Sequence, residues 1–141
     1  MCCRREVGPD LQRIRKTHFP HGGKHTMSRK ELKNLFKLSH KVSVYVPTLQ
    51  QSGEAVKDGW VETTAALLSK LFGGSTSSDC VGYWILASGK LQREAVKLVF
   101  SYAEKITDDA VDAVYQHSLS MKSACNQEAV AIEIDGELYF V

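Results

Sequence analysis

The sequence contains no long run of apolar residues. Its uninterrupted apolar stretches are a few residues long, such as "YFV" at the C-terminus, whereas a membrane-spanning helix needs about 20 apolar residues. The N-terminal "MCCRREVGPDLQRIRK" is basic, but neither an apolar segment nor a small-residue cleavage site follows it, so no secretory signal is expected. We therefore expect a cytoplasmic protein without a membrane-spanning segment.

Cysteine is scarce, and no C-x-x-C pair occurs among the four cysteines. Cys2 and Cys3 are adjacent near the N-terminus, which is a poor arrangement for a disulfide framework. We expect Cys80 and Cys125 to be reduced thiols that are buried by default. The reactivity of Cys80 depends on its exposure, which the sequence does not give.

A phosphate-binding loop is also missing. The segment "GGSTSS" at residues 73–78 lacks the lysine of the G-x-x-x-x-G-K-[ST] motif. It follows a predicted helix, whereas anion-binding loops precede one. We interpret it as the end of a helix and a turn, and we expect no cofactor.

Acidic residues are few in the first 41 residues, where 3 Asp and Glu stand against 11 Lys and Arg, a net charge of +8. Residues 42–141 hold 13 acidic and 7 basic residues, a net charge of −6. A basic arm on an acidic body is typical of proteins that bind nucleic acid or membrane surfaces. An acidic body has few free cationic side chains to neutralise the phosphates of a nucleic acid. We therefore expect RNA binding only if residues 1–26 belong to the native protein.

Three interpretations of the segment "HFPHGGKHTM" remain open. His18, His21 and His25 have a spacing that can bind zinc, although few apolar residues are available to pack beneath a metal. In the second interpretation residues 1–26 are a disordered tail, because they are poor in large apolar residues. In the third interpretation they are a translated leader. Two glycine codons just ahead of Met27 can spell a ribosome-binding sequence, which would make Met27 the native first residue in place of Met1.

From Met27 onward, alternating helical and strand periods predict a regular order of elements. Ser28 and Glu31 have capping-box spacing and predict a short helical appendage over residues 27–40. The apolar alternation of "KVSVYVP" predicts the first strand, and "WVETTAALLSKLFGG" predicts a helix that ends at its glycines. The segments "VGYWILA" and "EAVKLVFSYA" predict an antiparallel strand pair joined at "SGK".

The remaining sequence predicts one helix and a terminal hairpin. Thr107 is a typical N-cap residue followed by two acidic residues, and Asp135-Gly136 is a preferred two-residue hairpin turn. The order β-α-β-β-α-β with a C-terminal edge strand predicts an α+β fold, the ferredoxin-like split βαβ arrangement, as one domain over residues 41–141.

Three short motifs carry a family resemblance. "FGGST" at residues 72–76, "GYW" at 82–84 and "SGKLQRE" at 88–94 resemble the pattern of small bacterial, plasmid and phage proteins with a ferredoxin-like fold. The resemblance covers residues 41–141. It implies the fold, but it implies no activity and no functional residues.

We expect the open face of the sheet to be the functional surface. In the second long strand, the apolar set Val96, Leu98, Phe100 and Tyr102 is predicted to face the helices. Tyr45, Trp84, Lys97 and Val99 are then the candidate binding residues on a semi-apolar face, and a single sheet layer with such a face is commonly covered by a second layer. This predicts an interaction protein that forms a homodimer or binds a protein partner. Such a protein could serve as an accessory protein of a mobile element.

The alternative is a small enzyme of the dimeric α/β-barrel type. Its pocket would lie near Trp84, Glu94 and His117, with His117 as the general base beside the acid Glu94. No nucleophile or orienting partner stands at fixed spacing from His117, so a binding role is the primary expectation. Convergence of the three side chains in one concave pocket would favour the enzyme.

Overall fold

The computed structural model describes residues 27–57 and 59–141. The candidate zinc ligands His18, His21 and His25, and the choice between a native tail and a translated leader, lie outside the described residues. The chain divides into two units, Met1–Lys37 and Leu38–Val141. Among the described residues, no helix has the length and hydrophobicity needed to cross a membrane.

The described part of the first unit contains one short helix, α2 (Arg29–Leu32). The Glu31 carboxylate accepts a hydrogen bond from the Ser28 backbone N–H at 2.7 Å. The Ser28 hydroxyl accepts one from the Glu31 N–H at 3.4 Å. The predicted capping box is therefore present, on a helix of only four residues.

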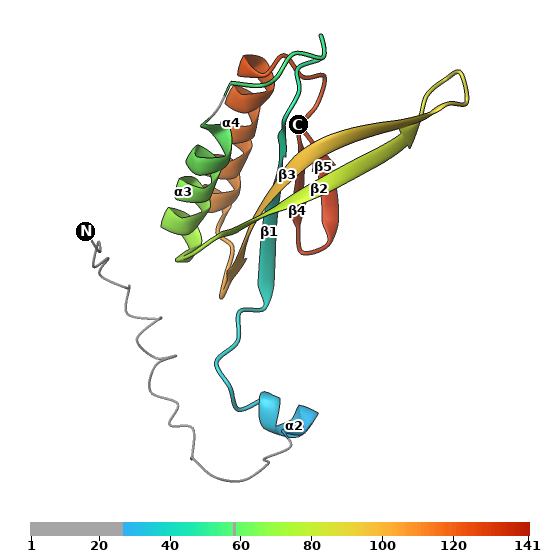
Figure 1. The fold of residues 1–141 in the computed structure, drawn as a ribbon. Coiled ribbons are helices and arrows are strands. Elements are labelled where there is room, and N and C mark those ends of the chain that lie inside the picture. Colours follow the sequence, from blue (N-terminus) through green and yellow to red (C-terminus); the bar gives the residue numbers. More distant parts are fainter. Residues whose placement is uncertain (1–26, 58) are drawn as a thin grey trace, which may run out of the picture. The chain divides into compact units, whose positions relative to one another are not determined.

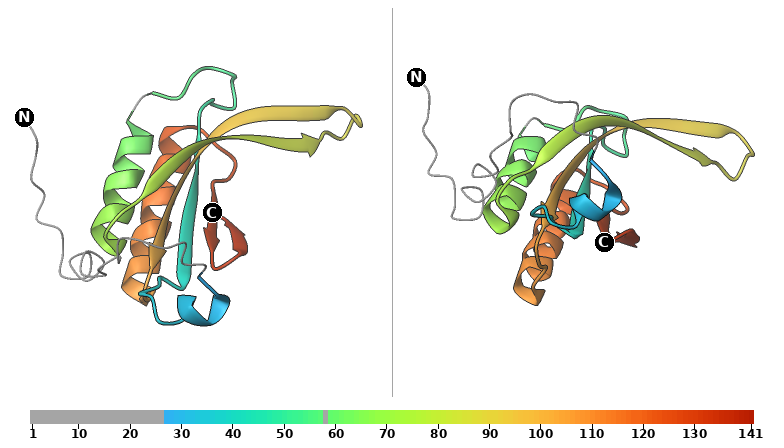
Figure 2. Two further views of the ribbon diagram at one scale, coloured as in Figure 1. Left: turned by 60° about the horizontal axis from the view of Figure 1, so that its bottom comes forward. Right: turned by 90° about the horizontal axis from the view of Figure 1, so that it is seen from below.

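The second unit is a five-stranded antiparallel sheet with two helices on one face (Figures 1 and 2). Its elements in chain order are β1 (His40–Pro47), α3 (Trp60–Phe72), β2 (Thr76–Ile85), β3 (Leu91–Ala103), α4 (Asp108–Ala124), β4 (Ala131–Ile134) and β5 (Glu137–Phe140). The strand order is β2-β3-β1-β4-β5. This confirms the α+β fold, the ferredoxin-like split βαβ topology and the added edge strand.

Local signals explain where the elements begin and end. The Thr107 hydroxyl accepts a hydrogen bond from the Ala110 N–H at the start of α4. Helix α3 ends at Gly73, whose φ of 92° suits a residue without a Cβ atom. The β4–β5 turn places Asp135 and Gly136 at φ angles of 52° and 87°, as a two-residue hairpin of this sequence requires.

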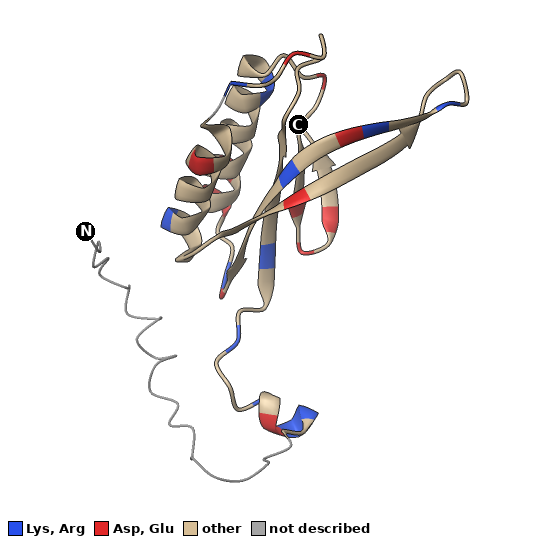
Figure 3. Cartoon of the chain, in the orientation of Figure 1, with Lys and Arg blue, Asp and Glu red and all other residues tan. Residues whose placement is uncertain are grey.

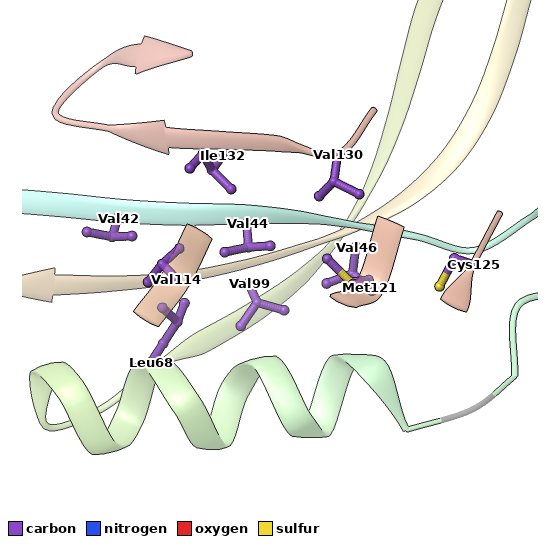
Figure 4. Packing of buried hydrophobic residues seen from close by; sticks show 10 residues of the cluster. All are labelled: Val42, Val44, Val46, Leu68, Val99, Val114, Met121, Cys125, Val130 and Ile132. Atoms are coloured by element: carbon purple, nitrogen blue, oxygen red, sulfur yellow. The ribbon is translucent and has the colours of Figure 1, made fainter. Parts of the chain in front are cut away.

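The core lies between the sheet and the two helices (Figure 4). The sheet supplies Val42, Val44, Val46, Val99 and Ile132, the residue before β4 supplies Val130, and the helical side supplies Leu68, Val114, Met121 and Cys125. Burial of Cys125 agrees with the expectation from the sequence, and Cys80 is half-buried.

The predicted faces of β3 are wrong. Val44 lies directly opposite Val99, and Val42 opposite Ser101. Residues paired across an antiparallel ladder share a face, so Val99 faces the helices with the β1 valines and is fully buried. The set predicted to face inward, including Phe100 and Tyr102, lies on the open face. The prediction failed because it followed the richer apolar set and left the register with β1 out of account.

Strands β2 and β3 extend well beyond the rest of the sheet. The β1–β3 ladder stops where Pro47 meets Val96, whereas β2 and β3 continue to the pair Ile85 and Leu91. Residues 81–95 therefore form a two-stranded ribbon, called the arm below, which projects from the body of the unit (Figures 1 and 2). The arm positions the candidate site.

Candidate functional site

A cleft of about 330 Å³ lies between the arm and two loops of the body. The arm contributes Trp84, Gln92, Arg93 and Glu94 to its lining. The loop after β1 contributes residues from 49 to 53, and the segment before β4 contributes residues 127–129. Its volume falls at the lower end of the range for small-molecule sites.

Hairpin register places three of these side chains together. Trp84 lies directly opposite Gln92, and Gly82 lies opposite Glu94. Because paired and alternate residues share a face, Trp84, Gln92 and Glu94 project from the same face of the arm. Gly82 has no side chain to cover its neighbour, so one flank of Glu94 stays open.

Side-chain to main-chain hydrogen bonds hold the opposite walls of the cleft. The Thr48 hydroxyl donates to the Ala95 carbonyl at 2.5 Å and ties the loop after β1 to the base of the arm. The Gln127 amide donates to the Leu49 carbonyl at 2.7 Å and to the Cys125 carbonyl at 3.2 Å. The two body loops are thereby joined to each other, so the walls of the cleft are preorganised.

Glu94 is the acidic group of the cleft whose properties are altered by its surroundings. Partial burial raises the pKa of the Glu94 carboxyl above its usual value, because desolvation disfavours the charged form. A cation placed beside Glu94 would restore the missing stabilisation and lower this pKa. The lining also holds a second carboxylate, Glu128, and one cation, Arg93, so its net charge is negative and favours a ligand that carries positive charge.

His117 occupies a different place. Its Nε2 atom lies 2.8 Å from the Thr64 hydroxyl, and its ring packs edge-on against Trp60 at a centroid distance of 5.5 Å. Burial lowers the pKa of His117. The structure brings Trp84 and Glu94 into one cleft, whereas His117 belongs to the contact between α3 and α4 and does not line that cleft.

The four residues predicted to share the open sheet face do not share one surface. Tyr45 pairs with Leu98 and lies on the helix-free face, and Trp84 lies on the arm. Lys97 is opposite Val46 on the helix side, where it forms an ion pair with Asp79. Val99 belongs to the core.

Sequence reasoning missed the polar walls of the cleft. Gln127 and the residues around Gly53 follow no motif, and the motif "SGKLQRE" that contains Gln92 implied no functional residue. These residues come together only where the arm meets the loops of the body. One signal was available for the arm itself. Counting outward from the turn at "SGK" pairs Trp84 with Gln92, which would have placed Glu94 on the same face.

Comparison with known proteins identifies structural neighbours but no family. No family model matches the sequence, and no curated protein matches it. A phage SAM lyase in complex with S-methyl-5'-thioadenosine has a TM-score of 0.56 at 16% identity, with 83% of this chain and 95% of that chain covered. A phage SAM lyase in the apo state has a TM-score of 0.51 at 15% identity, with 73% and 88% covered.

A third structural neighbour is more distant. A Bacillus cereus protein related to NIF3 has a TM-score of 0.38 at 18% identity, with 72% of this chain and 25% of that chain covered. At the identities of the two lyase structures, the likeness is one of fold. The chain therefore shares its fold, over nearly the whole length of the neighbour, with a phage lyase.

Proposed function

We propose that this protein is a small lyase of S-adenosyl sulfonium compounds and that the cleft beneath the arm is its substrate site. The observation that carries the proposal is the projection of Trp84 and Glu94 from one face of the arm into one cleft. The shared fold with a lyase that holds S-methyl-5'-thioadenosine supports the choice of ligand class. This adopts the enzyme alternative of the sequence analysis, with His117 left out of the site.

The chemistry of the lining matches the parts of such a substrate. An adenine ring is flat and aromatic, and an indole such as that of Trp84 provides a face on which it can stack. The sulfonium carries a positive charge, which the partly desolvated Glu94 carboxylate attracts. The Gln92 amide lies on the same face and can pair with hydroxyl or amino groups of the ligand.

The reaction type sets different tasks for these residues. When the sulfonium of S-adenosylmethionine is cleaved, the carboxylate of the same substrate can attack the carbon next to sulfur and form a C–O bond, which closes a lactone. The C–S bond breaks as this bond forms, its electron pair stays on sulfur, and the sulfur leaves as an uncharged thioether. The attraction between Glu94 and sulfur therefore weakens as the reaction proceeds. Glu94 acts mainly on substrate affinity, whereas Trp84 holds the adenosine part in both substrate and product.

Calorimetry of the purified full chain tests the proposal directly. We expect S-adenosylmethionine and S-methyl-5'-thioadenosine to bind, and chromatography of the reaction mixture to show the thioether accumulating. Trp84→Ala should abolish binding of both compounds. Tyr115→Ala, which alters an exposed side chain of α4 outside the cleft, is the matched control. Absence of binding by the unaltered protein would refute the proposal.

A second candidate function is the protein interaction predicted from the sequence. A specific observation favours it: Tyr83, Ile85 and Leu91 are 59%, 64% and 56% exposed on the arm, and a patch of this kind commonly binds another protein. In this function the arm replaces the central sheet face as the binding surface. A cytoplasmic role within a phage or other mobile element suits both candidates.

A further inference from the structure

We propose that Gln92 makes the cleft selective for adenine, because its side-chain amide pairs with the N6 amino group and the N7 atom of a base stacked on Trp84. This role of Gln92 rests on the proposed function and deepens it. It assigns the choice of adenine over the related base hypoxanthine to one side chain of the arm.

Gln92 and Trp84 form a cross-strand pair on the arm. The two residues lie directly opposite each other in the β2–β3 ladder, and both line the cleft. Residues that are directly opposite in an antiparallel ladder have Cβ atoms about 5 Å apart. A flat base that stacks on the Trp84 indole therefore has its edge within reach of the Gln92 amide.

The Gln92 amide is available to a ligand. Gln92 is half-buried, and its side chain has no hydrogen-bond partner within the described residues. The Gln127 amide, in contrast, already donates to two backbone carbonyls. Gln50 and Gln51 belong to the loop after β1, not to the face of the arm that carries Trp84. A half-buried amide without a partner favours a ligand that supplies both a donor and an acceptor.

Adenine supplies this pair of groups at its N6/N7 edge. The N6 amino group donates a hydrogen bond and N7 accepts one, so the oxygen and the NH₂ group of a glutamine bind both at once. Hypoxanthine has a carbonyl oxygen in place of the amino group, so both groups of this edge are acceptors. Gln92 would keep one of the two hydrogen bonds, and its oxygen would face an acceptor. The loss of such a paired contact weakens binding about tenfold or more.

The N1 edge of the base would not provide this selectivity. Adenine presents a donor at N6 and an acceptor at N1, whereas hypoxanthine presents an acceptor at O6 and a donor at N1. An amide that turns over binds either arrangement equally well. Selection of adenine by Gln92 therefore requires contact with N7.

Calorimetry of the purified full chain with two uncharged ligands tests the role of Gln92. S-Methyl-5'-thioadenosine and S-methyl-5'-thioinosine differ only in the base. We expect the unaltered protein to bind the adenine compound about tenfold more tightly or better, and Gln92→Ala to bind the two with similar affinity. Gln92→Arg should prefer the inosine compound, because a guanidinium donates to O6 and N7 together, as it does to guanine.

Gln116→Arg is the matched control. Gln116 is an exposed glutamine of α4 outside the lining of the cleft, so this change should leave the preference for adenine unaltered. Gln92→Arg adds a cation to an arm that already carries Lys90 and Arg93, and Figure 3 shows basic residues at its tip and along it. Because both ligands are uncharged, an effect of charge alone would change the two affinities equally and leave their ratio constant.

A ligand without N7 tests which edge of the base is bound. The 7-deaza analogue of S-methyl-5'-thioadenosine keeps the N6 amino group and the N1 edge. It should bind the unaltered protein about as weakly as S-methyl-5'-thioadenosine binds Gln92→Ala. Unchanged affinity for the analogue would show that N7 is not bound and would overturn the proposal.

Failure of the Gln92 contact is distinguished from failure of the cleft. If the unaltered protein binds neither nucleoside, the proposed function is refuted and the role of Gln92 with it. If it binds both equally, or if Gln92→Ala keeps the full preference for adenine, Gln92 does not select the base, although the cleft remains the ligand site. A reversed preference in Gln51→Arg but not in Gln92→Arg would likewise overturn the assignment.

Discussion

The Nε2 atom of His117 lies 2.8 Å from the Thr64 hydroxyl, and this contact joins α4 to α3. The Thr64 hydroxyl also lies 2.6 Å from the Trp60 carbonyl, to which it donates its single proton. Since that proton is used, His117 must donate through Nε2. The histidine is therefore a structural residue between two helices.

This contact predicts a loss of stability in mild acid. Burial lowers the pKa of His117 below its usual 6.5 in the folded protein, so the unfolded chain takes up the proton first. The contribution of the neutral His117 to the free energy of unfolding is fully present above about pH 6.5. It is lost as the pH falls below that value toward the lowered pKa. Urea unfolding should give a lower free energy of unfolding at pH 5.5 than at pH 7.5. The difference between the two pH values should be smaller in His117→Gln. An equal pH dependence in both proteins would contradict this role.

The register of β3 predicts which valines support the core. Val99→Ala removes two methyl groups from a fully buried site and should lower the free energy of unfolding by roughly 2 kcal/mol. The same substitution at Val81, which is 41% exposed on the arm, should cost less than about 0.5 kcal/mol. Chemical denaturation measures both. Equal losses would mean that the assigned faces are incorrect.

Glu94 predicts a pH-dependent affinity for the sulfonium. Because burial raises the pKa of Glu94, its carboxylate is neutralised at a higher pH than an exposed one, and affinity for S-adenosylmethionine should fall as the pH drops through that raised pKa. Glu94→Gln should remove this dependence and raise KM more than it lowers kcat. S-Methyl-5'-thioadenosine, which lacks the sulfonium charge, should bind with little pH dependence. If the affinity of both compounds changed with pH in the same way, Glu94 would not be the group that recognises the sulfonium.

Gly82 offers a substitution that should separate ligand binding from stability. A Cβ atom at this position would lie 3.9 Å from the Glu94 carbonyl oxygen, which is an ordinary contact, so the fold tolerates a side chain. Gly82→Val should maintain or raise the melting temperature, because valine favours strands. It should weaken ligand binding at least tenfold, because the new side chain covers the open flank of Glu94. If Gly82→Val bound the ligand with unchanged affinity, the ligand would bind outside this cleft.

The order of elements could be predicted from local patterns, whereas the faces and the cleft could not. Thr107 and the pair Asp135-Gly136 specify their cap and turn through their own backbone preferences, so these features followed from the sequence. The burial of Val99 depends on its pairing with Val44, which is more than 50 residues away. Local alternation carries no information about such pairing.

The candidate residues show the same division. Trp84 and Glu94, which the enzyme alternative placed near one another, line one cleft because a hairpin brings nearby residues together. His117 was added to them without a constraint on where α4 would pack. The walls supplied by Gln127 and the residue 49–53 loop depend on a contact between segments almost 80 residues apart, for which no local pattern exists.

The position of β1 in the sheet has a consequence for synthesis on the ribosome. Among the described strands β1 is made first, yet it lies in the interior of the sheet, where Val42 pairs with both Ser101 and Ile134. While α3 and the β2–β3 hairpin form from neighbouring residues, one edge of β1 has no partner until β4 emerges. A chain shortened by its final hairpin would retain an open, valine-rich strand edge, which is prone to aggregation. Strand β4 therefore protects the edge of a strand that the ribosome makes much earlier.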